Sequence, residues 1–222
     1  MENVLRSGLE SGSFVYAAEL VLGRDHDQSA VETFVRDASQ EPNGIKIISA
    51  TDLPGGNVAL PPEAFISYVA EHGLTSVAHL SGKDGNRSSL ESRLHSLARM
   101  GSENILALTG DAHKDAFAGR AKPVYDLDSV LILTLIDQAR RGVEYRMGPR
   151  TLQTTPFDFL AGAVVSPYKV GEPDQMMQYY KLHLKMAAGA QFIVTQLGYN
   201  LRKLWELRQY MVREGLGHVP VI

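Results

Sequence analysis

Residues 188–200 read Ala-Gly-Ala-Gln-Phe-Ile-Val-Thr-Gln-Leu-Gly-Tyr-Asn, so that a helix pattern ends at a glycine and an apolar strand pattern follows at once. The strand pattern finishes in the polar pair Thr195 and Gln196. A second apolar pattern, at residues 104–111, ends in the same way in Thr-Gly-Asp. Since ligands of parallel α/β proteins bind at the C-terminal ends of strands, these polar ends predict a ligand site at one edge of a parallel sheet.

The composition is that of a globular chain, because 44% of the 222 residues are hydrophobic and the formal net charge is only −3. The absence of cysteine excludes disulfides, thiolate metal sites and a cysteine nucleophile. The seven histidines show no metal-ligand spacing, so we propose no metal. The weak negative charge argues against a nucleic-acid partner, and the apolar run 130–136 is too short to span a membrane. We expect a cytoplasmic protein.

Strand patterns alternate with helix patterns along the whole chain, as in proteins built from βα units. The seven strand patterns are residues 14–20, 44–49, 75–80, 104–108, 159–165, 191–196 and 218–222. The six helix patterns are residues 28–38, 61–72, 88–100, 128–141, 174–188 and 200–214. Short units of this kind predict a parallel sheet with right-handed crossovers.

Two parallel architectures are then open, a doubly wound sheet and a (β/α)8 TIM barrel. No Gly-x-Gly-x-x-Gly follows a strand pattern and no Walker loop is present, so a nucleotide-binding doubly wound fold loses its main support. We expect an α/β TIM barrel that forms a single domain over residues 1–222. Seven strand patterns leave this barrel incomplete at its C-terminal end, so the chain is expected to be a fragment or to be closed by another chain.

Motifs spread over about residues 14–222 resemble those of the methylenetetrahydrofolate reductase family. Their order and spacing together are more specific than any one of them. The motifs are Glu19, Ala78-His79-Leu80, Leu108-Thr109-Gly110-Asp111, the segment from Gly162 to Pro167, Ala188-Gly189-Ala190 and Thr195-Gln196. Residues 83–87, Thr109 and residues 156–162 resemble a branch of the family found in one-carbon and methyl-transfer pathways.

The resemblance implies a flavoprotein that reduces 5,10-methylenetetrahydrofolate to 5-methyltetrahydrofolate, an oxidoreductase of tetrahydrofolate interconversion and methionine biosynthesis. FAD is the implied cofactor, and NAD(P)H or a redox partner protein is the implied electron donor. The implied assembly is a homo-oligomer or a complex with a partner subunit.

Two carboxylates are implied as catalytic residues. Glu19 lies between the apolar residues Ala18 and Leu20 and is implied as the general acid that protonates the departing N10 amine of the folate. A partly buried glutamate with a raised pKa is suited to that step near neutral pH, although a structural carboxylate bonded to a neighbouring strand is an alternative. Asp111 is implied to lie near the flavin and the pterin, where its charge tunes both; a turn aspartate is the alternative.

Further side chains are implied to bind the substrate and the cofactor. The amide of Gln196 is implied to hydrogen-bond the pterin, since it both donates and accepts, or else it faces water. His79 is implied to pack at the flavin, with a structural histidine as the alternative. Lys181 and Lys185, one helical turn apart, are suited to phosphates or form a solvated helix face. The implied cofactor contacts are Thr51, His79, Thr109, Gly110, Asp111, Tyr125, Ser166, Gln178, Lys181 and Lys185.

The chain departs from the family pattern at several of these positions. Ser166 stands where many members have tyrosine, Gln178 where they have aspartate, and Thr109 where they have a phosphate-contacting arginine. These changes weaken the expected grip on the adenine half of FAD, so FMN is an alternative cofactor. Residues 197–199, Leu-Gly-Tyr, replace a more aromatic run, which leaves the electron donor open.

Two other functions stay open. One is a non-catalytic or partner-dependent subunit of a methyl-transfer complex that binds flavin or folate. The other is a pterin-binding methyltransferase barrel, which does not predict the flavin motifs.

Overall fold

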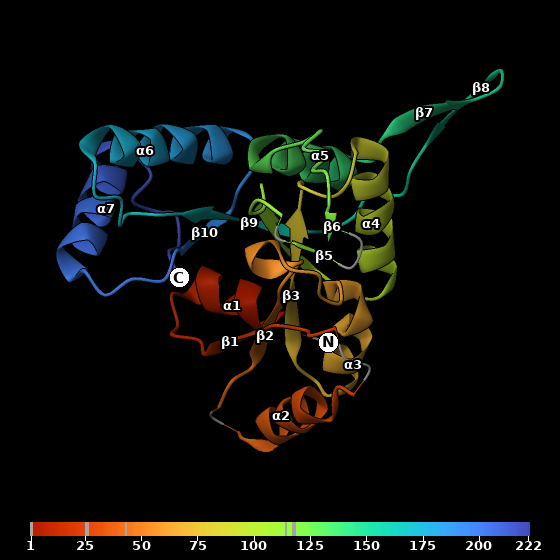
Figure 1. Cartoon of the computed structure of the whole chain (residues 1–222), viewed down its shortest axis with the longest axis horizontal. Coiled ribbons are helices and arrows are strands. Elements are labelled where there is room, and N and C mark those ends of the chain that lie inside the picture. Colours follow the sequence, from red (N-terminus) through yellow and green to blue (C-terminus); the bar gives the residue numbers. More distant parts are fainter. Residues whose placement is uncertain (1, 25–26, 43, 114, 117–118) are drawn as a thin grey trace.

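The computed structural model describes the chain apart from residues 1, 25–26, 43, 114 and 117–118 (Figure 1). Its main sheet has six parallel strands in the order β1-β2-β3-β4-β9-β10. The strands are β1 (Ala17–Leu20), β2 (Ile47–Ala50), β3 (Thr75–Ser81), β4 (Asn104–Leu108), β9 (Leu160–Val165) and β10 (Phe192–Thr195). Each strand pairs with the next main strand along the chain, which is the order of a barrel and has no switch point. The prediction of an incomplete α/β TIM barrel is confirmed.

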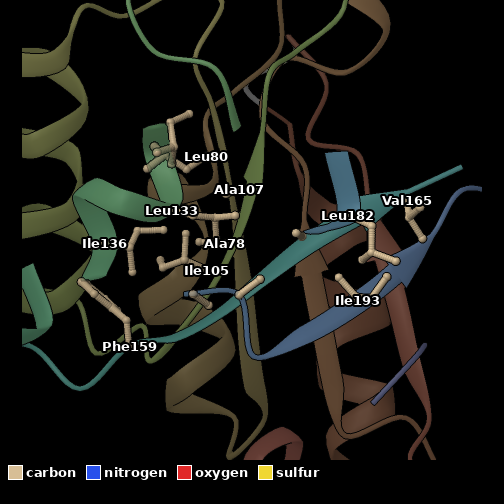
Figure 2. Packing of buried hydrophobic residues seen from close by; sticks show 14 of the residues in the cluster. Ala78, Leu80, Ile105, Ala107, Leu133, Ile136, Phe159, Val165, Leu182 and Ile193 are labelled. Atoms are coloured by element: carbon tan, nitrogen blue, oxygen red, sulfur yellow. The ribbon is translucent and has the colours of Figure 1, made fainter. Parts of the chain in front are cut away.

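Helices cover the outer face of this sheet. They are α2 (Ser29–Gln40), α3 (Ile66–Glu71), α4 (Arg87–Arg99), α5 (Ser129–Arg141), α6 (Glu172–Ala187) and α7 (Leu201–Arg213). Figure 2 shows Leu133 and Ile136 of α5 beside the strand residues Ala78 and Ile105, all fully buried in one apolar cluster. Apolar residues at helical spacing on one side and at every second strand position on the other produce this layer.

A helix that the sequence patterns did not predict, α1 (Val4–Ser11), covers the inner face of the sheet at its N-terminal end. Leu5 of α1 is buried against an apolar set that includes Ile47, Val77 and Leu106. The side chain of Asn3 caps α1 by accepting from the backbone N–H of Arg6 at 3.1 Å. It also donates to the side chain of Asn104 at 2.9 Å, which ties α1 to β4. A cavity lies at the C-terminal end of the inner face, which α1 does not cover.

Several element boundaries differ from the expected ones. The first strand begins at Ala17, not at residue 14, because Phe14 is 84% exposed and lies outside the sheet. The expected helix at 61–72 is divided into a short 3-10 helix (Pro62–Ala64) and α3, since Phe65 has non-helical angles. The expected strand at 218–222 is a single bridge between Ile193 and Val221.

Two small hairpins also escaped the sequence patterns. They are β5 (Asp115–Ala116) with β6 (Gly119–Arg120), and β7 (Glu144–Met147) with β8 (Arg150–Gln153). The second hairpin projects from the body of the molecule, and β7 is exposed along its whole length (Figure 1). A strand that buries neither face carries no hydrophobic alternation, so its sequence gives little signal.

Candidate functional site

A cavity of about 890 Å³ lies at the C-terminal ends of the parallel strands. Its apolar wall includes Leu106, Leu108, Val164 and Val194 from the inner face of the sheet. Its rim is formed by the loops that follow the strands, among them residues 51–55. Barrel enzymes place their ligands at this end, because each strand delivers one loop to the same opening.

Ten of the twelve residues predicted for the site line this one cavity. They are Glu19, Thr51, His79, Thr109, Gly110, Asp111, Ser166, Gln178, Lys185 and Gln196. The two that do not line it are Tyr125 and Lys181. Tyr125 lies beside it and donates its hydroxyl to the carbonyl of Gly110 at 3.5 Å, while Lys181 is exposed one turn before Lys185 on α6.

The two carboxylates predicted as catalytic residues are both exposed. Glu19 lies on β1, at the edge of the sheet, in register with Ser49 of β2. Its exposure differs from the expected partial burial, because an edge strand has a neighbour on one side only. Asp111 follows Gly110 beyond the end of β4, where no strand covers it. Both side chains reach the cavity from its rim.

His79 lies on β3 and is only 5% exposed. Its Nε2 atom lies 2.7 Å from the hydroxyl of Ser49 on the neighbouring strand. Burial lowers the pKa of His79 from 6.5 to about 4. The imidazole is therefore neutral at neutral pH and contributes a hydrogen-bonding group to the wall, without a positive charge.

Lys185 of α6 brings a cation to the cavity. Its Nζ atom donates to the carbonyl of Val164, at the end of β9, at 2.5 Å. Burial, and to a smaller degree the charge of Lys181, lower the pKa of Lys185 to about 8, although the carboxylate of Asp128 acts in the opposite direction. Close by, the side chain of Gln178 accepts from the backbone N–H of Ser166 at 3.3 Å, which joins α6 to the end of β9.

Thr109 and Gly110 shape the wall at the end of β4. The hydroxyl of Thr109 accepts from the backbone N–H of Ser129 at 3.1 Å and so holds the first turn of α5. Gly110 has a φ of +93°, and a Cβ atom there would lie 2.2 Å from the hydroxyl oxygen of Ser81. Glycine is therefore required at this position both by its backbone angle and by the close approach of β3.

The polar wall residues Asp52, Ser81 and Ser129 were not predicted from the sequence. The Ser81 hydroxyl is buried and has no hydrogen-bond partner among the residues that the structure describes. Ser81 directly follows a strand pattern and Asp52 lies three residues after one, so the signal used for Gln196 was also present near them. Ser129 reaches the cavity through the start of α5, which strand-end reasoning does not consider.

Among the residues that the structure describes, no group of three or more His, Asp or Glu side chains is placed to hold a metal ion. None of the described helices combines the length and the apolar character that crossing a membrane requires.

Solved structures with a similar fold include three chains of low sequence identity. A 2,3-dimethylmalate lyase of the PEP mutase/isocitrate lyase superfamily has 16% identity and a TM-score of 0.59, over 98% of this chain and 67% of that one. An oxaloacetate acetylhydrolase has 11% identity and a TM-score of 0.60, over 98% and 77%. An uncharacterized protein from Clostridium thermocellum has 14% identity and a TM-score of 0.61, over 98% and 68%; it binds two copies of 5-methyl-5,6,7,8-tetrahydrofolic acid.

At these identities the likeness shows the fold alone. No curated protein sequence matches the chain. The family model of methylenetetrahydrofolate reductase, however, matches residues 5–222, which is nearly the whole chain. The chain therefore belongs to the methylenetetrahydrofolate reductase family.

Proposed function

We propose that the cavity binds a reduced folate together with a flavin, and that the protein reduces 5,10-methylenetetrahydrofolate to 5-methyltetrahydrofolate. The observation that carries this proposal is the assembly of ten predicted residues, far apart in the sequence, around one cavity. Membership of the reductase family supports the same reaction, as does the similar Clostridium thermocellum fold that binds methyltetrahydrofolate.

The cavity fits a flavin in size and in the chemistry of its wall. Its volume of about 890 Å³ lies near the upper end of ligand sites, which suits a cofactor beside a substrate. The apolar side chains of Leu106, Leu108 and Val164 offer a surface for a ring system. The buried, unsatisfied hydroxyl of Ser81 borders the same space and fits a polar ligand atom placed against it. FAD is the cofactor that we propose, with FMN as the alternative.

The residues of the chain have separate roles in this proposal. A reduced flavin, when bound, supplies the hydride for such a reduction. Glu19 gives a proton to the N10 amine as the five-membered ring of the substrate opens, so that one hydride and one proton are added in total. Gln196 holds the pterin by its amide, and the charge of Asp111, near both ligands, tunes them. Lys185 pairs with a cofactor phosphate.

A partner-dependent form of this function is a second candidate, and the exposure of Glu19 favours it. A general acid works best where water is excluded, yet Glu19 lies on the edge strand β1 and faces solvent. A second chain packed beside β1 would enclose this carboxylate. Electrons would then come from NAD(P)H or from that partner protein.

The first experiment is an absorption spectrum of the purified chain, reconstituted with FAD or FMN, followed by anaerobic reduction and addition of 5,10-methylenetetrahydrofolate. We expect a flavin band that bleaches on reduction and returns on addition of the folate. Release and chromatography of the bound cofactor separate FAD from FMN. Absence of flavin binding under all of these conditions would contradict the proposed reductase function, and activity that needs an added partner would favour the second candidate.

The variant Glu19→Gln tests the proton donor. It keeps the shape of the side chain, so we expect flavin binding and flavin reduction to be unchanged, while reduction of the folate slows by about 10²–10⁴-fold. The control Glu32→Gln changes an exposed carboxylate on α2 and is expected to keep full activity. Full turnover in Glu19→Gln would remove Glu19 from the acid role.

A further inference from the structure

An ion network lies directly behind the loop that follows β2. The guanidinium of Arg93, on α4, donates to both carboxylate oxygens of Asp52 at 2.9 and 3.2 Å. It also donates to both carboxylate oxygens of Glu63 at 2.6 and 2.9 Å. The exposed fractions of the side chains are 23% for Arg93, 1% for Asp52 and 15% for Glu63. One arginine thus holds two carboxylates in bidentate geometry, which fixes direction as well as distance.

Asp52 connects this ion network to the sheet. Its Oδ2 atom accepts from the backbone N–H of Ser81, at the end of β3, at 2.8 Å. The preceding residue, Thr51, donates from its backbone N–H and from its hydroxyl to the carbonyl of Leu20, both at 3.1 Å. The loop is therefore attached to β1 on one side and to β3 and α4 on the other. Asp52 is also part of the cavity wall, as are the residues on either side of it.

The loop that these contacts hold has an unfavourable backbone. Leu53 has a φ of +49°, a left-handed conformation that is unfavourable for a residue with a side chain. Gly56 has a φ of +73°, and a Cβ atom there would lie 1.9 Å from the carbonyl oxygen of Ala112. The loop thus packs backbone to backbone against the residue that follows Asp111. A conformation of this kind persists where the surroundings determine it.

We propose that Arg93 is a positioning residue of the ligand cavity. It holds residues 51–56 in their strained conformation and, through the contact of Gly56 with Ala112, sets the place of Asp111. Arg93 does not line the cavity and touches no ligand in this proposal, so its effect on binding is transmitted through Asp52. The inference deepens the proposed function and rests on it for the identity of the ligand.

Amide hydrogen exchange tests the positioning without any ligand. We expect Arg93→Met to speed exchange in peptides covering 51–57 and 110–113, while the buried face of α4 around Leu94 and Leu97 stays protected. Arg93→Lys keeps the charge but not the planar fork, and it is expected to give the same pattern more weakly. The matched control is Arg87→Met. Arg87 also lies on α4 and binds Asp126 in bidentate geometry, but it is exposed and outside the cavity wall.

Ligand affinity gives the second measurement, by calorimetric titration with 5-methyltetrahydrofolate. We expect Arg93→Met to weaken binding about tenfold or more, because a small displacement of a site residue is enough for such a loss. Should Arg93→Met not fold, Glu63→Gln removes the negative charge and one of the two acceptor oxygens that Glu63 offers to Arg93, without touching the cavity wall. For that variant we expect a smaller loss of affinity and faster exchange in the same two peptides.

The outcomes separate the two proposals. Unchanged exchange at 51–57 and 110–113 in the folded Arg93 and Glu63 variants overturns the positioning role, as does wild-type affinity in those variants. A uniform rise of exchange over the whole chain also overturns it, since that result marks a general loss of stability. If the wild-type protein binds no folate at all, the proposed function fails, while the exchange pattern still decides the role of Arg93.

Discussion

Glu19 and Asp52 are carboxylates near the ends of neighbouring strands, yet they differ in burial and in hydrogen bonding. Asp52 is buried and accepts hydrogen bonds from Arg93 and from the backbone of β3. Glu19 is exposed on the edge strand. The inner strands of the sheet thus fix the geometry of the cavity with groups that are already paired, and the rim leaves its polar groups available to a ligand. Substitutions at the inner strands should accordingly change mainly stability, and substitutions toward the rim mainly ligand binding.

The largest effect is expected at Gly110, which packs closely against Ser81 of β3. Gly110→Ala forces a left-handed residue to carry a Cβ atom that meets Ser81, so we expect the free energy of unfolding to fall by about 4 kcal/mol, the sum of backbone and overpacking costs. The control is Gly12→Ala, whose φ of +68° is similar but whose surroundings are open. Urea unfolding measures both. Equal losses in the two variants would show that only the backbone angle matters.

His79 is expected to make the inner strands sensitive to acid. Because its folded pKa of about 4 lies below the unfolded value of 6.5, the unfolded chain takes up the proton first as the pH falls. This stability is present above about pH 6.5 and is lost progressively down to about pH 4, by about 3 kcal/mol in total.

The difference in unfolding free energy between pH 7 and pH 4 checks this expectation. His79→Gln should show a smaller loss than the wild type by that amount, whereas His218→Gln, at an exposed position, should behave as the wild type does. An identical pH dependence in His79→Gln would contradict the lowered pKa and would mean that the buried imidazole of His79 takes up a proton in the folded protein.

A moderate effect is expected at Lys185, between the core and the rim. Its amine loses its charge as the pH rises through about 8, so affinity for FMN should decline above that pH. Lys185→Met should weaken FMN binding about fivefold, near 1 kcal/mol, and should remove this decline. Fluorescence titration at several pH values measures it, with Lys203→Met as the control, because Lys203 lies on α7, pairs with Glu206 and is not part of the cavity wall. A decline that survives in Lys185→Met would assign the titration to another group.

The smallest effect is expected at the outer edge. Phe14 is 84% exposed and contacts Tyr16 edge to face, so Phe14→Ser should change the free energy of unfolding by less than about 0.5 kcal/mol. The comparison is Leu5→Ala, which empties a fully buried position under the sheet and should cost about 3 kcal/mol. A large loss in Phe14→Ser would indicate that a further surface covers this edge in solution.

The sequence patterns predicted all six strands of the main sheet, since short runs rich in apolar residues alternate with helix patterns along the chain. They could not predict α1, because the burial of Leu5 depends on residues from five distant strands that meet only in the folded sheet. The cavity-lining residues at strand ends were predicted through motifs. Arg93 was not, since its partners lie 41 and 30 positions away and no local pattern links them.

The sequence by itself determined the order of strands and helices, the end of the sheet that would carry polar groups, and the family. These follow from local periodicity and from motifs, which need no knowledge of distant contacts. The tertiary structure decided which of the polar groups are buried and which remain available. Burial lowers the pKa of His79, and Asp52 is buried in an ion pair with Arg93. Glu19 is exposed because it lies on an edge strand. These differences arise in the tertiary structure because solvent access depends on how distant strands are assembled.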